Sequence, residues 1–129
     1  MFRPTAWLSI LLALSGGIIF STGLFAGILS DQLISAAELG EIDKVKGLLD
    51  QGVPVEARNE DGWTALMKAT YEGHEKIVRE LIAKGAGVDT RENEGWTSLM
   101  MAAQFGHRDI AKILLSSGAR IDIRSGSGA

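Results

Sequence analysis

Cysteine is absent from this sequence of 129 residues, and its absence removes several kinds of chemistry at once. Disulfide bonds, thiolate nucleophiles and cysteine-ligated metal sites are all excluded. The lack of cysteine is compatible with an oxidising compartment and does not require one. A chain of this length forms one domain, with room for a short appendage.

An excess of basic residues is also missing. All 16 acidic residues and 12 of the 13 basic residues lie at or after Asp31, so this part of the chain carries a net charge of −4. Nucleic acids select for clustered lysine and arginine side chains, which pair with the phosphates. The mildly acidic, mixed surface therefore argues against a nucleic-acid partner.

Charge of either sign is missing from residues 4–30, a run of 27 residues. Arg3 precedes this run, residues 6–14 are apolar except for one serine, and a softer stretch with more small residues follows. A basic start, an apolar middle and small residues later are the order of a secretory signal. Residues 1–30 are therefore predicted to be a signal peptide or a signal anchor.

Two interpretations of residues 1–30 stay open. A signal peptide needs small residues at its cleavage site, and Ser21-Thr22-Gly23 meets this need better than a site ending at Ala26. A membrane anchor needs about 20 apolar residues, which 6–29 would supply as an apolar helix. A buried helix of a soluble domain is disfavoured, because the run has no polar face.

Both interpretations place the rest of the chain on the same side of a membrane. Arg3 lies before the apolar run, whereas acidic residues dominate directly after it, beginning with Asp31 and Glu38. Basic flanking residues stay on the cytoplasmic side. The body of the chain is therefore predicted to be exported, either to the periplasm or to the non-cytoplasmic face of a membrane.

The body contains an octet that occurs twice. Gly62-Trp63-Thr64-Ala65-Leu66-Met67-Lys68-Ala69 returns 33 residues later as Gly95-Trp96-Thr97-Ser98-Leu99-Met100-Met101-Ala102. The same spacing aligns leucines at positions 33, 66 and 99 and glycines at positions 40, 73 and 106. A fixed period of this length indicates stacked structural repeats. We divide the body, 31–125, into three units, 31–60, 61–93 and 94–125, followed by a flexible tail at 126–129.

Each unit is predicted to consist of a helix, a turn and a second helix. In the middle unit, Thr64 can cap the first helix through its hydroxyl, and Gly73 can end it in a left-handed conformation. Asp31 occupies the cap position of the first unit, so its helix is expected to begin there. Such short helices are marginal alone, so the units must stack and bury the aligned leucines, Leu99 included.

Two motifs within this period identify a family. Residues 64–69 and 97–102 follow a Thr-x-Leu-x-x-Ala pattern, and Gly-His pairs precede the second helices of the last two units. In these features the body resembles the ankyrin-repeat family, whose signature is Thr-Pro-Leu-His-x-Ala. The resemblance implies an all-α solenoid of three helix-turn-helix units that binds proteins. Because Met67 and Met100 replace the signature histidine, its hydrogen bonds between repeats are expected to be missing.

Candidate catalytic or metal-binding groups are few. His74 and His107 are the only histidines and occupy equivalent positions one unit apart. Without a carboxylate framework beside them, both are expected to be helix-start residues rather than metal ligands or proton shuttles. No phosphate-binding loop or Ser-His-Asp arrangement occurs. Carboxylates such as Glu60 and Glu92 are expected in solvated loop tips, so neither an enzyme nor a bound cofactor is predicted.

Aromatic residues give the most specific indication of a binding surface. Trp63 and Trp96 precede the capping threonines, at a position that the family leaves variable and often uses for binding. Tyr71 and Phe105 lie near the ends of the first helices, in neighbouring columns of one surface. Alternatively, the two tryptophans pack on each other as a rigid spine. The predicted partner-binding surface comprises Glu60, Asp61, Trp63, Lys68, Tyr71, Glu72, Asn93, Glu94, Trp96, Met101, Gln104 and Phe105.

We therefore expect a non-catalytic protein-binding module that is exported and binds an envelope or extracellular protein. The acidic rim of its surface favours a basic or mixed partner. Resemblance to periplasmic ankyrin proteins implies a small bacterial envelope protein with a scaffold, chaperone-like, inhibitor or immunity role. Three alternatives stay open: a membrane-anchored structural or recruiting subunit, a small enzyme or metal protein using His74 or His107, and a stack completed by self-association.

Overall fold

A computed structural model describes residues 19–124 of the chain. The predicted tail at 126–129 and most of the predicted leader lie outside these residues. The described part contains six helices and one isolated antiparallel bridge, between Arg58 and Thr64. The helices are α2 (Ile19–Leu39), α3 (Ile42–Asp50), α4 (Ala65–Glu72), α5 (Glu75–Ala83), α6 (Ser98–Gln104) and α7 (Arg108–Ser116).

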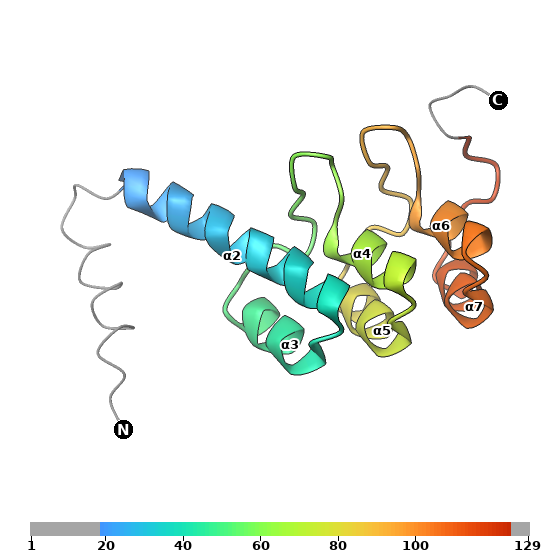
Figure 1. The fold of residues 1–129 in the computed structure, drawn as a ribbon, viewed down its shortest axis with the longest axis horizontal. Coiled ribbons are helices and arrows are strands. Elements are labelled where there is room, and N and C mark those ends of the chain that lie inside the picture. Colours follow the sequence, from blue (N-terminus) through green and yellow to red (C-terminus); the bar gives the residue numbers. More distant parts are fainter. Residues whose placement is uncertain (1–18, 125–129) are drawn as a thin grey trace.

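The helices form two rows that run along the molecule (Figure 1). One row consists of α2, α4 and α6, the other of α3, α5 and α7, and each helix packs against the next in its row. Successive helices pair as hairpins, and the long loops between hairpins project to the same side of the stack. The expected all-α stack of three helix-turn-helix units is confirmed for the described residues.

Short-range hydrogen bonds set where the first helices of the last two units begin and end. Thr64 Oγ1 accepts from the backbone N–H of Met67 at 3.3 Å, and Thr97 Oγ1 accepts from that of Met100 at 3.4 Å. Gly73 ends α4 with a φ of 81°, a left-handed conformation that glycine adopts most readily. The predicted capping roles of Thr64 and Gly73 are confirmed.

The first helix of the stack does not begin at Asp31, and this prediction was wrong. Helix α2 starts at Ile19 and passes through Asp31 to Leu39. Residues 24–30 contain no proline and a single glycine, so nothing in them forces the helical hydrogen bonding to stop. Among helices within residues 19–124, none combines the length and apolar character needed to cross a membrane.

The hydrophobic core lies between the two rows, at positions that recur from unit to unit. Leu33 and Leu66 are completely buried. Leu99, at the equivalent position of the third unit, is only partly buried. Helix α6 is the last of its row in the described part of the chain, so no further helix there covers Leu99. The expectation that Leu99 is buried like the other aligned leucines was therefore wrong.

Histidines connect consecutive units through backbone carbonyls. The Nε2 atom of His74 lies 2.9 Å from the carbonyl oxygen of Glu38, and that of His107 lies 2.9 Å from the carbonyl oxygen of Tyr71. Because a carbonyl oxygen can only accept, Nε2 carries the hydrogen in both bonds. His74 and His107 are also the N-cap positions of α5 and α7, as expected of helix-start residues.

Hydrogen bonds between repeats are therefore present, although the signature histidine is replaced. They come from the two histidines that start the second helices. Met67, at the signature position, is buried, and its sulfur lies 3.5 Å from the backbone nitrogen of Thr64 within the same unit. The expected loss of inter-repeat bonding thus applies to the signature position and not to the stack as a whole.

We expect Leu66→Ala to destabilise the fold by about 2–5 kcal/mol, because it removes a completely buried side chain. Leu99→Ala should cost clearly less, because Leu99 is already partly exposed. Urea unfolding followed by circular dichroism measures the free energy of unfolding of each variant. The two values can be compared when the free energy falls with urea concentration at the same slope. Equal losses for the two variants would show that Leu99 is covered in solution.

A second matched pair tests the histidine contact. A Cβ atom at Gly73 would lie 2.8 Å from Cε1 of His107, whereas nothing lies within 4 Å of one at Gly106. Both glycines have positive φ angles, 81° and 72°, so alanine strains either backbone by about 1–2 kcal/mol. Gly73→Ala should cost about 0.5–1.5 kcal/mol more, from displacement of the His107 hydrogen bond. Equal unfolding free energies would contradict this contact.

Candidate functional site

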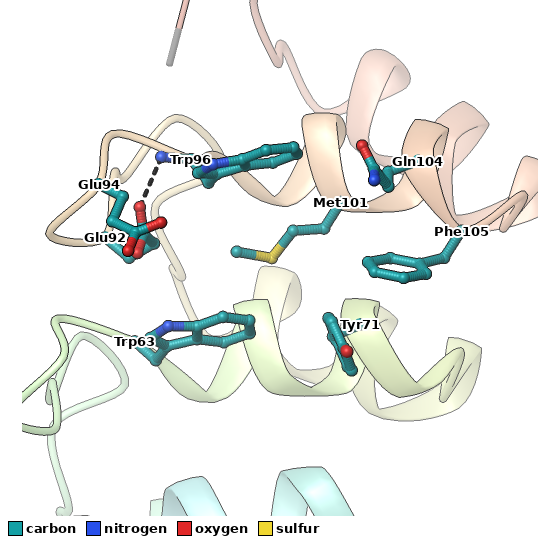
Figure 2. Close-up of a pocket in the computed structure, with 8 residues that line it drawn as sticks. All are labelled: Trp63, Tyr71, Glu92, Glu94, Trp96, Met101, Gln104 and Phe105. Carbon is teal, nitrogen blue, oxygen red and sulfur yellow. Dashed lines mark hydrogen bonds between the residues drawn. The ribbon is translucent and has the colours of Figure 1, made fainter. Parts of the chain in front are cut away.

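A hollow open to solvent lies between the second and third units. Its volume is about 240 Å³. Helices α4 and α6 and the loops that lead into them provide its walls (Figure 2). The residues that line it are Trp63, Tyr71, Glu92, Glu94, Trp96, Met101, Gln104 and Phe105.

Each tryptophan of the hollow is held at the base of a tight loop, directly before a capping threonine. The side-chain oxygen of Asn59 accepts from the backbone N–H of Trp63 at 2.9 Å. The backbone N–H of Asn59 donates to the carbonyl of Trp63 at 3.1 Å. In the next unit, Glu92 Oε1 accepts from the N–H of Trp96 at 2.7 Å, and its N–H donates to the Trp96 carbonyl at 3.0 Å. An amide and a carboxylate thus close the same loop in successive units.

Arginine side chains tie these loops to each other. Arg58 Nε donates to the carbonyl of Gly62 at 3.1 Å within its own loop, and its guanidinium also donates to the carbonyl of Arg91 in the next unit. Arg91 repeats both contacts, with Gly95 at 3.1 Å and with the carbonyl of Arg124. The guanidinium groups therefore link the loops, and they hold the tryptophan-bearing loops in register.

Three aromatic rings of the hollow form a connected series, those of Trp63, Tyr71 and Phe105. Trp63 and Tyr71 meet edge to face, with centroids 5.6 Å apart at 74°, and Tyr71 meets Phe105 at 4.5 Å and 64°. Figure 2 shows the thioether of Met101 reaching between the two indoles. Trp63 and Trp96 thus do not stack directly on each other, and both are only partly buried. The alternative of a tryptophan spine therefore does not describe their packing.

Lys68 lies beside the hollow and does not line it. Its ammonium nitrogen is 3.2 Å from Glu38 Oε1 and 4.7 Å from the centre of the Trp63 ring. The ion pair links α4 to α2, and the position over the indole is favourable because the ring face is electronegative. Lys68 is therefore a support for Trp63 rather than a wall of the hollow.

Glu92 is the lining residue that the sequence-based surface did not contain. It was expected in a solvated loop tip, but only 8% of its surface is exposed, so that expectation was wrong. The carboxylate folds back to close the loop onto the Trp96 backbone and is covered in doing so. Its alignment with Asn59, a typical turn residue, is the signal in the sequence that points to this inward position.

The residues of the predicted partner-binding surface divide into two groups. Seven line the hollow, namely Trp63, Tyr71, Glu94, Trp96, Met101, Gln104 and Phe105. Five lie outside it, namely Glu60, Asp61, Lys68, Glu72 and Asn93. Asn93 joins two loops, because its side-chain nitrogen donates to the carbonyl of Glu60 at 2.9 Å and its N–H donates to that of Asp61 at 3.1 Å. The structure thus separates an aromatic hollow from polar residues that brace or surround it.

Side chains that could hold a metal ion do not converge in the described part of the chain. Residues 19–124 contain no group of three or more His, Asp or Glu side chains placed to hold a metal ion. His74 and His107 point to carbonyl oxygens of the preceding unit rather than to each other. Outside the hollow, a hydrogen bond from the Arg120 guanidinium lowers the pKa of the exposed Asp122 carboxyl. The hollow therefore offers aromatic faces and carboxylates for binding.

Comparison with known protein families matches residues 33–125 to ankyrin repeats, in three copies. The match covers most of the chain and coincides with the three stacked hairpins. The chain therefore belongs to the ankyrin-repeat family. Among curated individual proteins, none shows significant similarity to it.

Proposed function

We propose that this protein is a non-catalytic module that binds another protein through the aromatic hollow. Ankyrin repeats are in general protein-binding modules, and this supports the class of function. The observation that carries the proposal is the convergence of aromatic side chains from two adjacent units on one open surface. Tyr71 and Phe105 are 40% and 47% exposed, although they contact each other. Exposed aromatic clusters of this kind are typical centres of protein interfaces.

The rigidity of the hollow supports the same proposal. Trp96 sits on a loop that is closed by Glu92 and tied to its neighbours by Arg91. Met101 is buried and rests between the indoles, so the floor of the hollow does not have to form on binding. A surface that is ordered before binding loses little conformational entropy on association, which favours affinity.

We also propose that the repeats lie outside the cytoplasm and bind an envelope or extracellular partner. The uncharged run at 4–30, with Arg3 before it and acidic residues after it, supports export. A membrane-anchored recruiting subunit is the second candidate, because an uncleaved run would be long enough to serve as an anchor. Within the first candidate, a scaffold, chaperone-like, inhibitor or immunity role follows from resemblance to exported ankyrin proteins.

We expect Trp96→Ala to weaken binding of the partner by at least about tenfold, since interface tryptophans often contribute 2 kcal/mol or more. The fold should remain, because Trp96 is only partly buried. Affinity purification from the native source, compared by quantitative mass spectrometry, measures the loss. Leu115→Ala is the matched control, because Leu115 is 45% exposed and lies outside the hollow. If the Trp96→Ala variant keeps the circular dichroism of the unchanged protein and still recovers as much partner, the proposed surface is wrong.

We expect the mature chain isolated from its native source to begin after Gly23, the better cleavage site. Intact-mass spectrometry distinguishes this form from one cleaved after Ala26 and from the uncleaved chain. Loss of the leader establishes export with release of the repeats. An intact chain that fractionates with membranes would instead favour the anchored subunit.

A further inference from the structure

The hollow contains a carboxylate that the rest of the described chain leaves without a counter-charge. Glu92 is 8% exposed, and no basic side chain within residues 19–124 forms an ion pair with it. Its Oε1 accepts from the Trp96 N–H, while Oε2 accepts no hydrogen bond from these residues. Among the described residues, Thr70 Oγ1 is the only fully buried side-chain nitrogen or oxygen atom without a partner, so Oε2 of Glu92 is open to solvent and can accept from a ligand.

The preceding unit shows that loop closure does not need a charge. Asn59 occupies the position equivalent to Glu92 and accepts from the N–H of Trp63 at 2.9 Å with a neutral amide oxygen. The two loops have the same backbone bond, from the N–H of residue 59 or 92 to the tryptophan carbonyl. The negative charge of Glu92 is therefore not needed to close the loop, and it lies in the hollow.

The surroundings of Glu92 suit a cation. Figure 2 shows Glu92 and Glu94 at one end of the hollow, the two indoles above and below its middle, and Tyr71 and Phe105 at the other end. The faces of aromatic rings attract cations, most strongly when the cation is desolvated. Trp63 already has this role inside the protein, since the Lys68 ammonium lies 4.7 Å from its ring centre.

We propose that the hollow binds an arginine side chain of the partner protein. This inference rests on the proposed function and names the chemistry of its anchor residue. The guanidinium donates to the free Oε2 of Glu92 and lies against the aromatic rings that line the hollow. Arginine fits better than lysine, because its guanidinium is planar, stacks on aromatic rings and is less strongly hydrated than an ammonium. Its charge also complements the acidic body of the chain.

The test uses two blocked pentapeptides, Ala-Ala-Arg-Ala-Ala and the same peptide with citrulline, the neutral analogue of arginine. The full-length protein is titrated with each peptide, and the indole N–H signals of Trp63 and Trp96 are followed by nuclear magnetic resonance. We expect the arginine peptide to shift both signals and to bind at least about tenfold more tightly than the citrulline peptide. The corresponding lysine and leucine peptides should bind more weakly than the arginine peptide.

A charge-neutral variant tests the role of Glu92 directly. Glu92→Gln keeps an oxygen that can accept from the Trp96 N–H, as Asn59 does in the preceding loop. It should weaken binding of the arginine peptide by about tenfold or more, through loss of a charge-assisted hydrogen bond. Glu80→Gln on α5 is the matched control, because it removes the same charge outside the hollow and should leave the peptide affinity unchanged.

Several outcomes would overturn the inference. They are equal binding of the citrulline, lysine or leucine peptide, absence of any shift at millimolar arginine peptide, and a folded Glu92→Gln variant that binds normally. Shifts of the indole signals on dilution without peptide would also overturn it, because a second copy of the chain would then occupy the hollow. If Glu92→Gln does not fold, the peptide pair still decides the question on the unchanged protein.

The test also separates this inference from the proposed function. If Trp96→Ala loses the native partner while Glu92→Gln retains it, the surface binds a protein but holds no arginine in the hollow. If Trp96→Ala retains the partner, the proposed surface itself is wrong, whatever the peptides show. The two failures are therefore distinct.

Discussion

The structure depends on the burial of each unit against the next. Helices α3 to α7 have only seven to nine residues each, too few for a helix to persist alone in water. Each of the first two hairpins is completed by the next one, which covers its leucine and donates a histidine hydrogen bond to one of its carbonyls. Where the described stack ends, Leu99, Leu115 and Ile121 line an apolar hollow instead of a core. Stability is thus a property of the stack and not of any one repeat.

The same stacking creates the candidate binding site. Trp63 and Tyr71 belong to the second unit, whereas Trp96 and Phe105 belong to the third, so no single repeat contains the aromatic hollow. The bonds that bring the units together, from Arg58 to Arg91 and from His107 to Tyr71, involve residues at repeated positions. Residues at variable positions then face one another across the junction. The two tryptophans of the hollow are repeated residues, whereas Tyr71, Glu92 and Phe105 each have a different residue one period away.

Much of the fold could be predicted from the sequence, because its signals are local or periodic. Thr64 and Gly73 act on backbone groups within a few residues, and a period of 33 residues is visible without coordinates. The wrong expectations concerned context. Asp31 is a residue type that caps helices well, but it lies inside α2, because residues 24–30 contain no proline that would end the helix before it. Leu99 has the right register, but burial requires a covering neighbour. Glu92 was assigned to solvent by residue type, whereas a hydrogen bond folds it inward.

The sequence by itself determined the number of units, their order and the positions that cap and stack them, since these follow from short-range hydrogen bonding and from hydrophobic spacing. It also marked most of the aromatic residues that line the hollow. Only the tertiary structure decided which of the predicted surface residues meet. It placed Met101 between the indoles, left Lys68 outside and turned Glu92 into the hollow. These outcomes depend on how two units approach each other, a distance and orientation that neither the period nor the residue types encode.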